Sequence, residues 1–204
     1  MPSGFFNCNP EEYRLAKMLE YACASPLFKP DTKDSGMLET YFGSSASYLH
    51  NGYTMAQLQA ATELIASPLC HAQRRRFVGA FARLAGMARA RLLQSMAEHD
   101  PAVVAPSDYM ELYQLQATTQ PGNSSTRRKA HSDGGWHVVA ISYNVHGSAV
   151  CGYEHDKATQ REMRLQAGQG WILCGPDVLT PKRRHFVGPS EAERVSLTFR
   201  HHLR

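Results

Sequence analysis

The sequence predicts an α+β fold in which a barrel or jelly roll of short strands is braced by N-terminal helices. Before about residue 100, apolar residues recur at helical spacing. After it, short segments alternate as strands do and are separated by turn residues. Helices followed by many short strands are typical of this class. The 204 residues suit a single domain over 1–204, with a mainly helical brace and lid region over 1–107 and a β-rich core over 108–204.

Helices are expected over 10–23, 54–66 and 69–98. Asn9 is the expected N-cap of the first helix, and Pro10 suits its first position. The last helix carries an apolar stripe that repeats every three or four residues and is formed by Phe77, Phe81, Leu84, Ala88, Leu92 and Met96. The arginines of this segment lie mainly off the stripe. We interpret them as a solvated face of a scaffold helix rather than as nucleic-acid contacts.

The strands expected in the second half are Tyr109–Ala117, Val138–Tyr143, Ala149–Tyr153, Glu162–Gln166, Gly170–Cys174, His185–Val187 and Arg194–Arg200. The connector over 30–52 carries several aromatic residues, and we expect it to be ordered. The end of the chain, Arg200–Arg204, is interpreted as a basic surface tail.

The composition excludes several classes of protein. Hydrophobic residues make up 43% and charged residues 20%, which excludes disorder as the main state. No apolar run is long enough to span a membrane, and no secretory signal is recognisable, so a cytoplasmic or nuclear protein is expected. The 5 cysteines are widely spaced and are interpreted as reduced thiols rather than as a disulfide framework or zinc site. Nucleotide-binding glycine loops and a serine-hydrolase elbow are missing.

Three residues carry the most specific chemistry. His131 and Asp133 form an H-x-D pair, which on an extended chain places both side chains on one face. His185, far along the chain, is the candidate third ligand. Two histidines and one carboxylate on one face of a metal ion form the facial triad of non-haem Fe(II) oxygenases.

The last strand adds a site for an anion. Arg194, Ser196 and Arg200 share one face of this strand. Arginine offers a planar fork that binds a carboxylate through two hydrogen bonds, and a serine hydroxyl adds a third. The alternative is a strand whose arginines face solvent.

Taken together, the order H-x-D, distal His and R-V-S-L-T-F-R resembles the Fe(II)/2-oxoglutarate-dependent oxygenases with a double-stranded β-helix, over about residues 109–200. The AlkB-like branch is the most similar, and the TET/JBP group and small-molecule hydroxylases share the wider pattern. The resemblance implies that Fe(II) is bound by His131, Asp133 and His185. It also implies that Arg194 pairs with the distal carboxylate of 2-oxoglutarate, that Ser196 is the polar residue beside it, and that Arg200 lies near the cosubstrate and the metal.

The activity implied is oxidation of a C–H bond with O₂ and 2-oxoglutarate as cosubstrates and succinate and CO₂ as products. For the AlkB-like and TET/JBP groups the oxidised group is a methyl on a nucleic-acid base, through oxidative demethylation or 5-methylpyrimidine oxidation. One departure concerns the Asn-x-Tyr pair that the AlkB-like branch carries before H-x-D. The stretch over 111–116 lacks this pair, and Tyr113 is the candidate substitute.

Basic residues lead into both histidine ligands. Lys182 and the pair Arg183 and Arg184 precede His185, and a second triplet precedes His131, formed by Arg127, Arg128 and Lys129. Convergence of the two triplets on one rim predicts an anionic substrate, with nucleic acid as the first hypothesis. Trp136 is a candidate for the wall of the pocket. Hydroxylation of a small molecule such as an amino acid stays open, and so does a non-catalytic jelly-roll binding module, although a binding module has no need of the two arginines.

Overall fold

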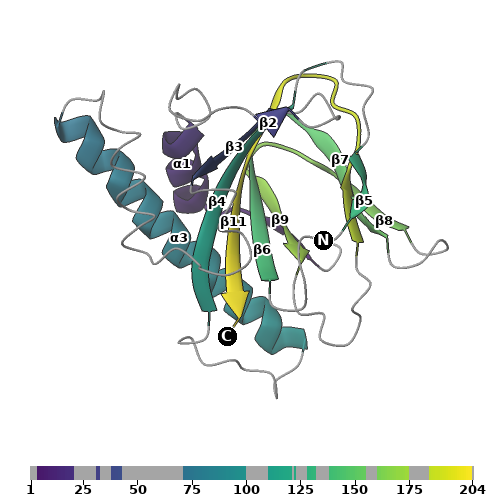
Figure 1. Ribbon diagram of the computed structural model, residues 1–204, viewed down its shortest axis with the longest axis horizontal. Coiled ribbons are helices and arrows are strands. Elements are labelled where there is room, and N and C mark those ends of the chain that lie inside the picture. The colour runs from purple at the N-terminus through teal and green to yellow at the C-terminus, as the bar shows by residue number, and fades with distance from the viewer. Residues whose placement is uncertain are drawn as a thin grey trace.

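The computed structural model describes residues 4–20, 31–32, 38–42, 71–99, 110–120, 122, 128–131, 138–154, 160–174 and 184–203. Two antiparallel sheets face each other, and two helices cover the outer side of the larger sheet (Figure 1). The larger sheet runs in the order β1 (Phe5–Asn7), β9 (Gln169–Cys174), β6 (Val138–His146), β11 (Arg194–Leu203), β4 (Met110–Gln120), β3 (Leu38–Phe42) and β2 (Asp31–Thr32). The smaller sheet runs in the order β5 (Arg128–His131), β10 (Arg184–Val187), β7 (Ala149–Glu154) and β8 (Gln160–Leu165). The helices are α1 (Pro10–Leu19) and α3 (His71–His99).

The strands predicted in the second half are all present, and β4, β6 and β11 extend beyond their predicted ends. The predicted α+β jelly roll braced by N-terminal helices is therefore confirmed. Among the described residues, no helix combines the length and the apolar composition needed to cross a bilayer.

Apolar and polar residues alternate along the central strands, so the two faces of the larger sheet differ in polarity. On β11, Val195, Leu197 and Phe199 pack into a hydrophobic core with residues of α1 and α3. Ile141 and Tyr143 of β6 join the same core. The residues between them point away from the helices, into the space between the sheets. A second, smaller apolar cluster fills one end of that space.

The helix boundaries follow from local chemistry. Asn9 and Glu12 form a reciprocal capping box, in which each backbone N–H donates to the other side chain at 2.8 Å. This confirms the predicted start of α1, whereas the helix ends at Leu19 rather than at residue 23. On α3 the stripe is buried as predicted from Phe81 to Met96. The side chain of Phe77 and the predicted helix over 54–66 lie outside the described residues.

The region over 1–107, expected to be mainly helical, also contributes β1, β2 and β3 to the larger sheet. One expectation needs correction. The interpretation of Arg200–Arg204 as a surface tail is wrong, because β11 continues to Leu203 and His201 is buried. The alternation that places Phe199 against the helices simply continues to His201.

Cys8 and Cys151 are free thiols, in agreement with the expected reduced state. Burial, with a smaller effect from Glu12, raises the pKa of the Cys8 thiol to about 12. Burial also raises the pKa of Cys151. Both thiols therefore stay protonated and unreactive near neutral pH.

A buried ion pair fastens the two helices to the sheet. Arg91 of α3 donates from Nε and Nη2 to the two carboxylate oxygens of Glu12, at 2.9 and 2.6 Å. Glu12 is 1% exposed, and it also accepts a hydrogen bond of 3.4 Å from the hydroxyl of Tyr143 on β6. The Arg91 guanidinium lies 4.2 Å from the ring centre of Phe6. One carboxylate thus joins α1, α3 and β6.

Arg91→Met should lower the free energy of unfolding by about 3 kcal/mol, because the aliphatic chain still packs while the Glu12 carboxylate is left buried without its cation. Denaturant unfolding measures this difference. Arg83→Met is the matched control, since Arg83 also pairs with α1, through Glu11, but both side chains are exposed. Its effect should stay below about 1 kcal/mol. Equal effects of the two substitutions would contradict the special role of the buried pair.

His201 should make stability depend on pH. Burial, and then the charge of Arg89, lower the pKa of His201 to about 3 from its ordinary value of 6.5. Between these values the unfolded chain binds a proton that the folded protein does not. Stability is therefore fully present above pH 6.5 and falls as the pH drops toward 3, with a slope approaching about 1.4 kcal/mol per pH unit.

His201→Leu should remove this component of the slope, as measured by urea unfolding at several pH values between 3 and 7. His146→Gln, at an exposed position at the end of β6, provides the comparison and should keep the wild-type slope. A wild-type slope in His201→Leu would mean that another group is responsible.

Candidate functional site

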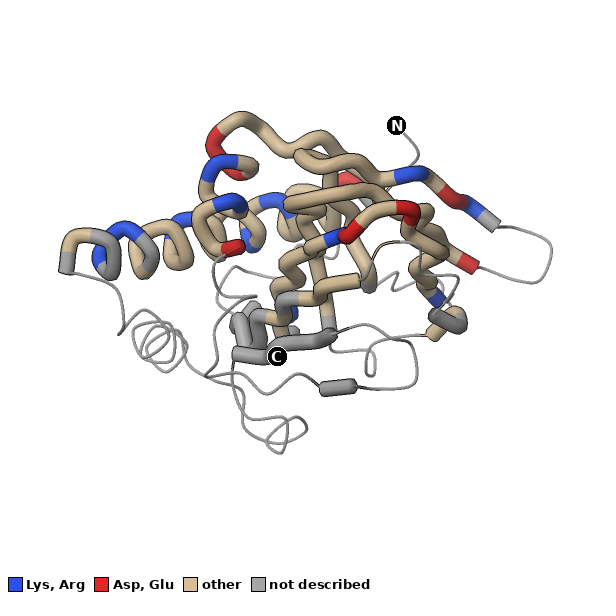
Figure 2. The backbone as a smooth tube through the Cα atoms, turned by 90° about the horizontal axis from the view of Figure 1, so that it is seen from above, with Lys and Arg blue, Asp and Glu red and all other residues tan. Residues whose placement is uncertain are grey.

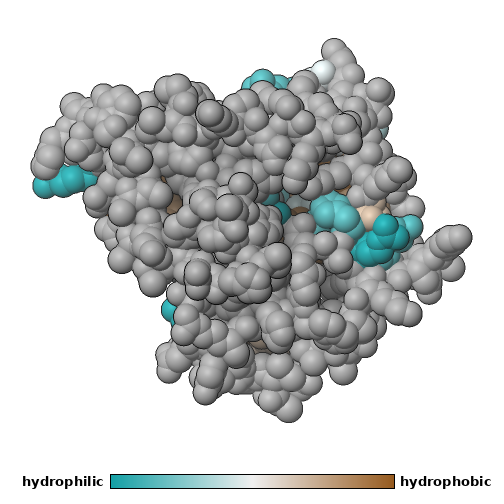
Figure 3. Space-filling model, in the orientation of Figure 1, coloured by the Kyte–Doolittle hydropathy of each residue, from teal (hydrophilic) through white to brown (hydrophobic). Residues whose placement is uncertain are grey.

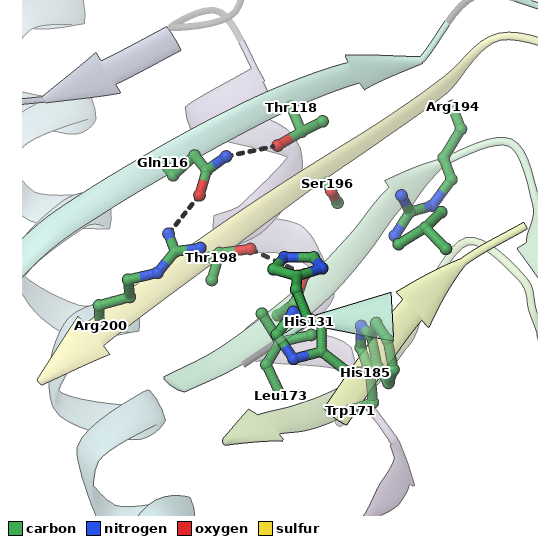
Figure 4. Close-up of a pocket in the computed structure, with 12 residues that line it drawn as sticks. Gln116, Thr118, His131, Trp171, Leu173, His185, Arg194, Ser196, Thr198 and Arg200 are labelled. Carbon is green, nitrogen blue, oxygen red and sulfur yellow. Dashed lines mark hydrogen bonds between the residues drawn. The ribbon is translucent and has the colours of Figure 1, made fainter. Parts of the chain in front are cut away.

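A pocket opens between the two sheets, and every strand that lines it belongs to the second half of the chain (Figure 4). Its lining residues are Gln116, Thr118, His131, Ser142, Trp171, Leu173, His185, Val187, Arg194, Ser196, Thr198 and Arg200. They come from β4, β6, β9 and β11 of the larger sheet and from β5 and β10 of the smaller one. None of these residues is acidic, so the described walls of the pocket favour an anion.

Two predicted metal ligands meet at this pocket. His131 on β5 and His185 on β10 are direct partners across an antiparallel strand pair. Their ring centres lie 4.4 Å apart. Both imidazoles can therefore bind one metal ion, which agrees with the donor set of a two-histidine, one-carboxylate site. Asp133 lies outside the described residues, and within the described part of the chain no group of three His, Cys, Asp or Glu forms a metal site.

Arg194 is the predicted anchor for a carboxylate, and it is 2% exposed. Its Nε donates to Oδ1 of Asn144 at 2.8 Å, and no described carboxylate forms an ion pair with it. Asn144 is held in turn, because its Nδ2 donates to the backbone oxygen of Gly147 at 2.8 Å. Gly147 has φ +64°, and a Cβ there would lie 2.0 Å from the backbone oxygen of Glu193. This turn requires glycine, and it fixes the amide that orients the arginine.

Arg200, the second predicted arginine, is buried at the other end of the same strand face. Its Nη1 donates to Oε1 of Gln116, and Nε2 of Gln116 donates to Oγ1 of Thr118 at 3.2 Å. Gln116 thus lies beside the second arginine, two residues before another polar side chain of β4. Tyr113 falls where the pairing of β4 and β11 shifts in register, and its side chain lies outside the described ones, so its role stays a prediction.

Ser196 lines the pocket between the two arginines, as predicted. Beside it, Thr198 donates from Oγ1 to Oγ of Ser142 at 3.0 Å. The functional candidates that sequence reasoning missed are Gln116, Thr118, Ser142, Asn144, Trp171 and Thr198. A signal for some of them was available, because polar residues alternate with apolar ones along β4, β6 and β11, in strands that have to be buried on both faces.

The predicted basic rim is described only in part. Arg127, Arg183 and Trp136 lie outside the described residues, as do the side chains of Arg128 and Lys129. Arg184 is exposed, but its charge is engaged: it lies 3.6 Å from the Glu154 carboxylate and donates to the backbone oxygen of Ala130. On the face shown in Figure 3, a group of hydrophilic residues lies over the smaller sheet.

The arginines of α3 are separated from the pocket by the larger sheet. Figure 2 shows basic residues, all of them arginines, spread along this helix. Arg75 and Arg76 are exposed, and α3 packs on the sheet face opposite to the pocket. This position agrees with a solvated face. It keeps the arginines of α3 away from a ligand in the pocket.

Comparison with known proteins identifies the fold. No protein-family model matches this sequence, and the search of curated proteins finds no match. Among solved structures, a prolyl-4-hydroxylase from Pseudomonas putida is similar with a TM-score of 0.51 and 11% identity, over 100% of this chain and 94% of that one. A prolyl hydroxylase from Trichoplax adhaerens, in complex with a peptide fragment of the hypoxia inducible factor oxygen degradation domain, has a TM-score of 0.56 and 9% identity, over 99% and 84% of the two chains. At such identities the likeness shows the fold, the jelly roll with helices. It gives no support to the AlkB-like branch, which stays a prediction.

Asn144→Ala should weaken binding of the cosubstrate expected from the sequence, 2-oxoglutarate, about tenfold, because Arg194 loses the hydrogen bond that orients its guanidinium. Isothermal titration with 2-oxoglutarate measures the change. Asn7→Ala is the control: it removes an exposed amide that accepts a hydrogen bond from Gln169 at the edge of the same sheet, and the affinity should not change. An unchanged affinity in Asn144→Ala would show that Arg194 needs no such support.

Proposed function

We propose that this chain is an Fe(II)- and 2-oxoglutarate-dependent oxygenase that hydroxylates a C–H bond. One observation carries the proposal: His131 and His185 are strand partners at a pocket that also contains a buried arginine with no described carboxylate beside it. A buried guanidinium is costly unless an anion compensates its charge. The fold shared with prolyl hydroxylases supports the same chemistry.

Fe(II) would be held by His131, His185 and Asp133, and when bound it supplies O₂ activation coupled to oxidative decarboxylation of 2-oxoglutarate. The other residues of the chain bind and orient. Arg194, held by Asn144, pairs with the distal carboxylate of 2-oxoglutarate. Ser196 offers a hydroxyl along the same wall. Arg200, held by Gln116, places a second positive charge in the pocket.

For the substrate we propose first a methyl group on a nucleic-acid base. The spacing of Arg194 and Arg200, which is that of the AlkB-like motif, and the basic residues leading into β5 and β10 support this choice. The pairing of Arg184 with Glu154 removes one cation from the rim, which favours the alternative of a small molecule such as an amino acid. Oligonucleotide binding that weakens steeply with salt distinguishes the two, because it reports counterion release. A screen for succinate release then identifies the substrate class.

Asp133→Ala should abolish Fe(II) binding and turnover of 2-oxoglutarate while the fold persists, because a metal site with two imidazoles alone loses its anionic ligand. Anaerobic titration with Fe(II) and 2-oxoglutarate, followed through the weak visible band of the chelate, measures binding. Circular dichroism verifies the fold.

Glu191→Ala removes a carboxylate from an exposed side chain and is the matched control, which should bind iron like the wild type. Normal turnover of 2-oxoglutarate by Asp133→Ala would refute the triad. A wild-type protein that binds neither iron nor 2-oxoglutarate would support a non-catalytic binding module of the cupin type.

A further inference from the structure

The indole N–H of Trp171 is a buried donor in the wall of the pocket. Trp171 is 1% exposed, and its Nε1 has no hydrogen-bond partner among the described residues. An indole nitrogen only donates, so it cannot be satisfied as an acceptor. Buried donors without a partner are rare in folded proteins because an unmade hydrogen bond in the interior costs free energy. In a pocket wall, such a donor indicates that a ligand supplies the missing acceptor.

A second donor lies beside it. Ser142 on β6 is the direct strand partner of Trp171 on β9, so both side chains stand on the pocket face of the sheet. The hydroxyl of Ser142 accepts the hydrogen bond from Thr198, which leaves its own O–H to donate. Ser142 is 2% exposed. The two residues therefore present two donors next to each other.

The indole is held in position on two sides. The ring of Phe5 stacks on it with centres 5.8 Å apart and an angle of 8° between the planes. The imidazole of His185 meets it edge to face, with centres 5.8 Å apart and an angle of 90°. The indole of Trp171 thus lies beside the histidines that we assign to the metal (Figure 4).

The distance along the sheet matches a dicarboxylic ketoacid. Thr198, the strand partner of Ser142, lies four residues from Arg194 on β11, which corresponds to about 13 Å. An arginine side chain and an extended five-carbon diacid together bridge about this distance. A ligand whose distal carboxylate pairs with Arg194 therefore brings its other end to Trp171 and Ser142.

We infer that Trp171 and Ser142 donate hydrogen bonds to oxygen atoms at the ketoacid end of 2-oxoglutarate, opposite to the end bound by Arg194. This inference rests on the proposed function. It makes Trp171 a cosubstrate-binding residue that selects for acids with oxygen acceptors at both ends. A monoacid of similar length gains only the contact with Arg194.

Nuclear magnetic resonance of the ¹⁵N-labelled protein tests the inference directly. The chain has 2 tryptophans, so its spectrum contains two indole N–H signals, and Trp171→Phe identifies the one that disappears. With Zn(II) as a diamagnetic substitute for Fe(II), 2-oxoglutarate should move the Trp171 indole proton downfield. Butyrate, which has a carboxylate at one end only, should leave it in place.

Affinities provide the second measurement. Trp171→Phe and Ser142→Ala should each weaken 2-oxoglutarate binding about five- to tenfold, through the loss of one hydrogen bond to a charged group, and should leave butyrate binding unchanged. Tyr143→Phe is the matched control, because it removes an aromatic donor next to Ser142 on the helix side of the sheet. It should lower stability without changing the affinity.

The outcomes separate the two proposals. If the wild type binds 2-oxoglutarate while the Trp171 signal stays in place and Trp171→Phe binds equally well, the donor pair is refuted and the proposed function stands. If the wild type does not bind 2-oxoglutarate at all, both are refuted. The signal of the wild type decides the matter even if a variant is unstable.

Discussion

The structure depends on a sheet that is apolar on one face and polar on the other, with both faces buried. Along β11, Val195 and Leu197 enter the core under the helices, whereas Arg194 and Ser196 enter the space between the sheets. Burying polar groups costs free energy unless they are hydrogen-bonded. The contacts of Thr198 with Ser142, and of Gln116 with Thr118, offset part of that cost. A polar interior of this kind favours the binding of a ligand between the sheets.

The apolar face keeps the polar face in place. Tyr143 points toward the helices from between Ser142 and Asn144, which point into the pocket. Its hydroxyl donates to Glu12, and burial raises its pKa well above the ordinary value, so it stays a neutral donor. Through Glu12 and Arg91 the position of β6 is coupled to both helices. Packing on the far side of the sheet therefore stabilises the strand that carries Asn144.

Periodicity and local chemistry were enough to predict most of the described elements. The apolar stripe located α3, the cap at Asn9 located α1, and alternation located the strands of the second half apart from β5. The sites of His185 and Arg194 in the pocket follow from the same spacing. The small N-terminal strands were missed, because their pairing with β9 and β4 joins segments far apart in the chain. For the same reason no local pattern could show that Asn144 holds Arg194 or that Trp171 contacts His185.

The energetics of Arg194 argue for a ligand-binding jelly roll over a structural one. A guanidinium removed from water loses several kcal/mol of solvation, and one neutral amide at its Nε does not restore it. A sheet that does not bind an anion would be more stable with an apolar side chain in place of Arg194. The same reasoning applies to Trp171, whose buried indole N–H has no partner among the described residues. A phenylalanine at this position would leave no donor unsatisfied. Because both costs fall on residues of one pocket, and both would be relieved by the two ends of one dicarboxylic ketoacid, a single ligand accounts for them together.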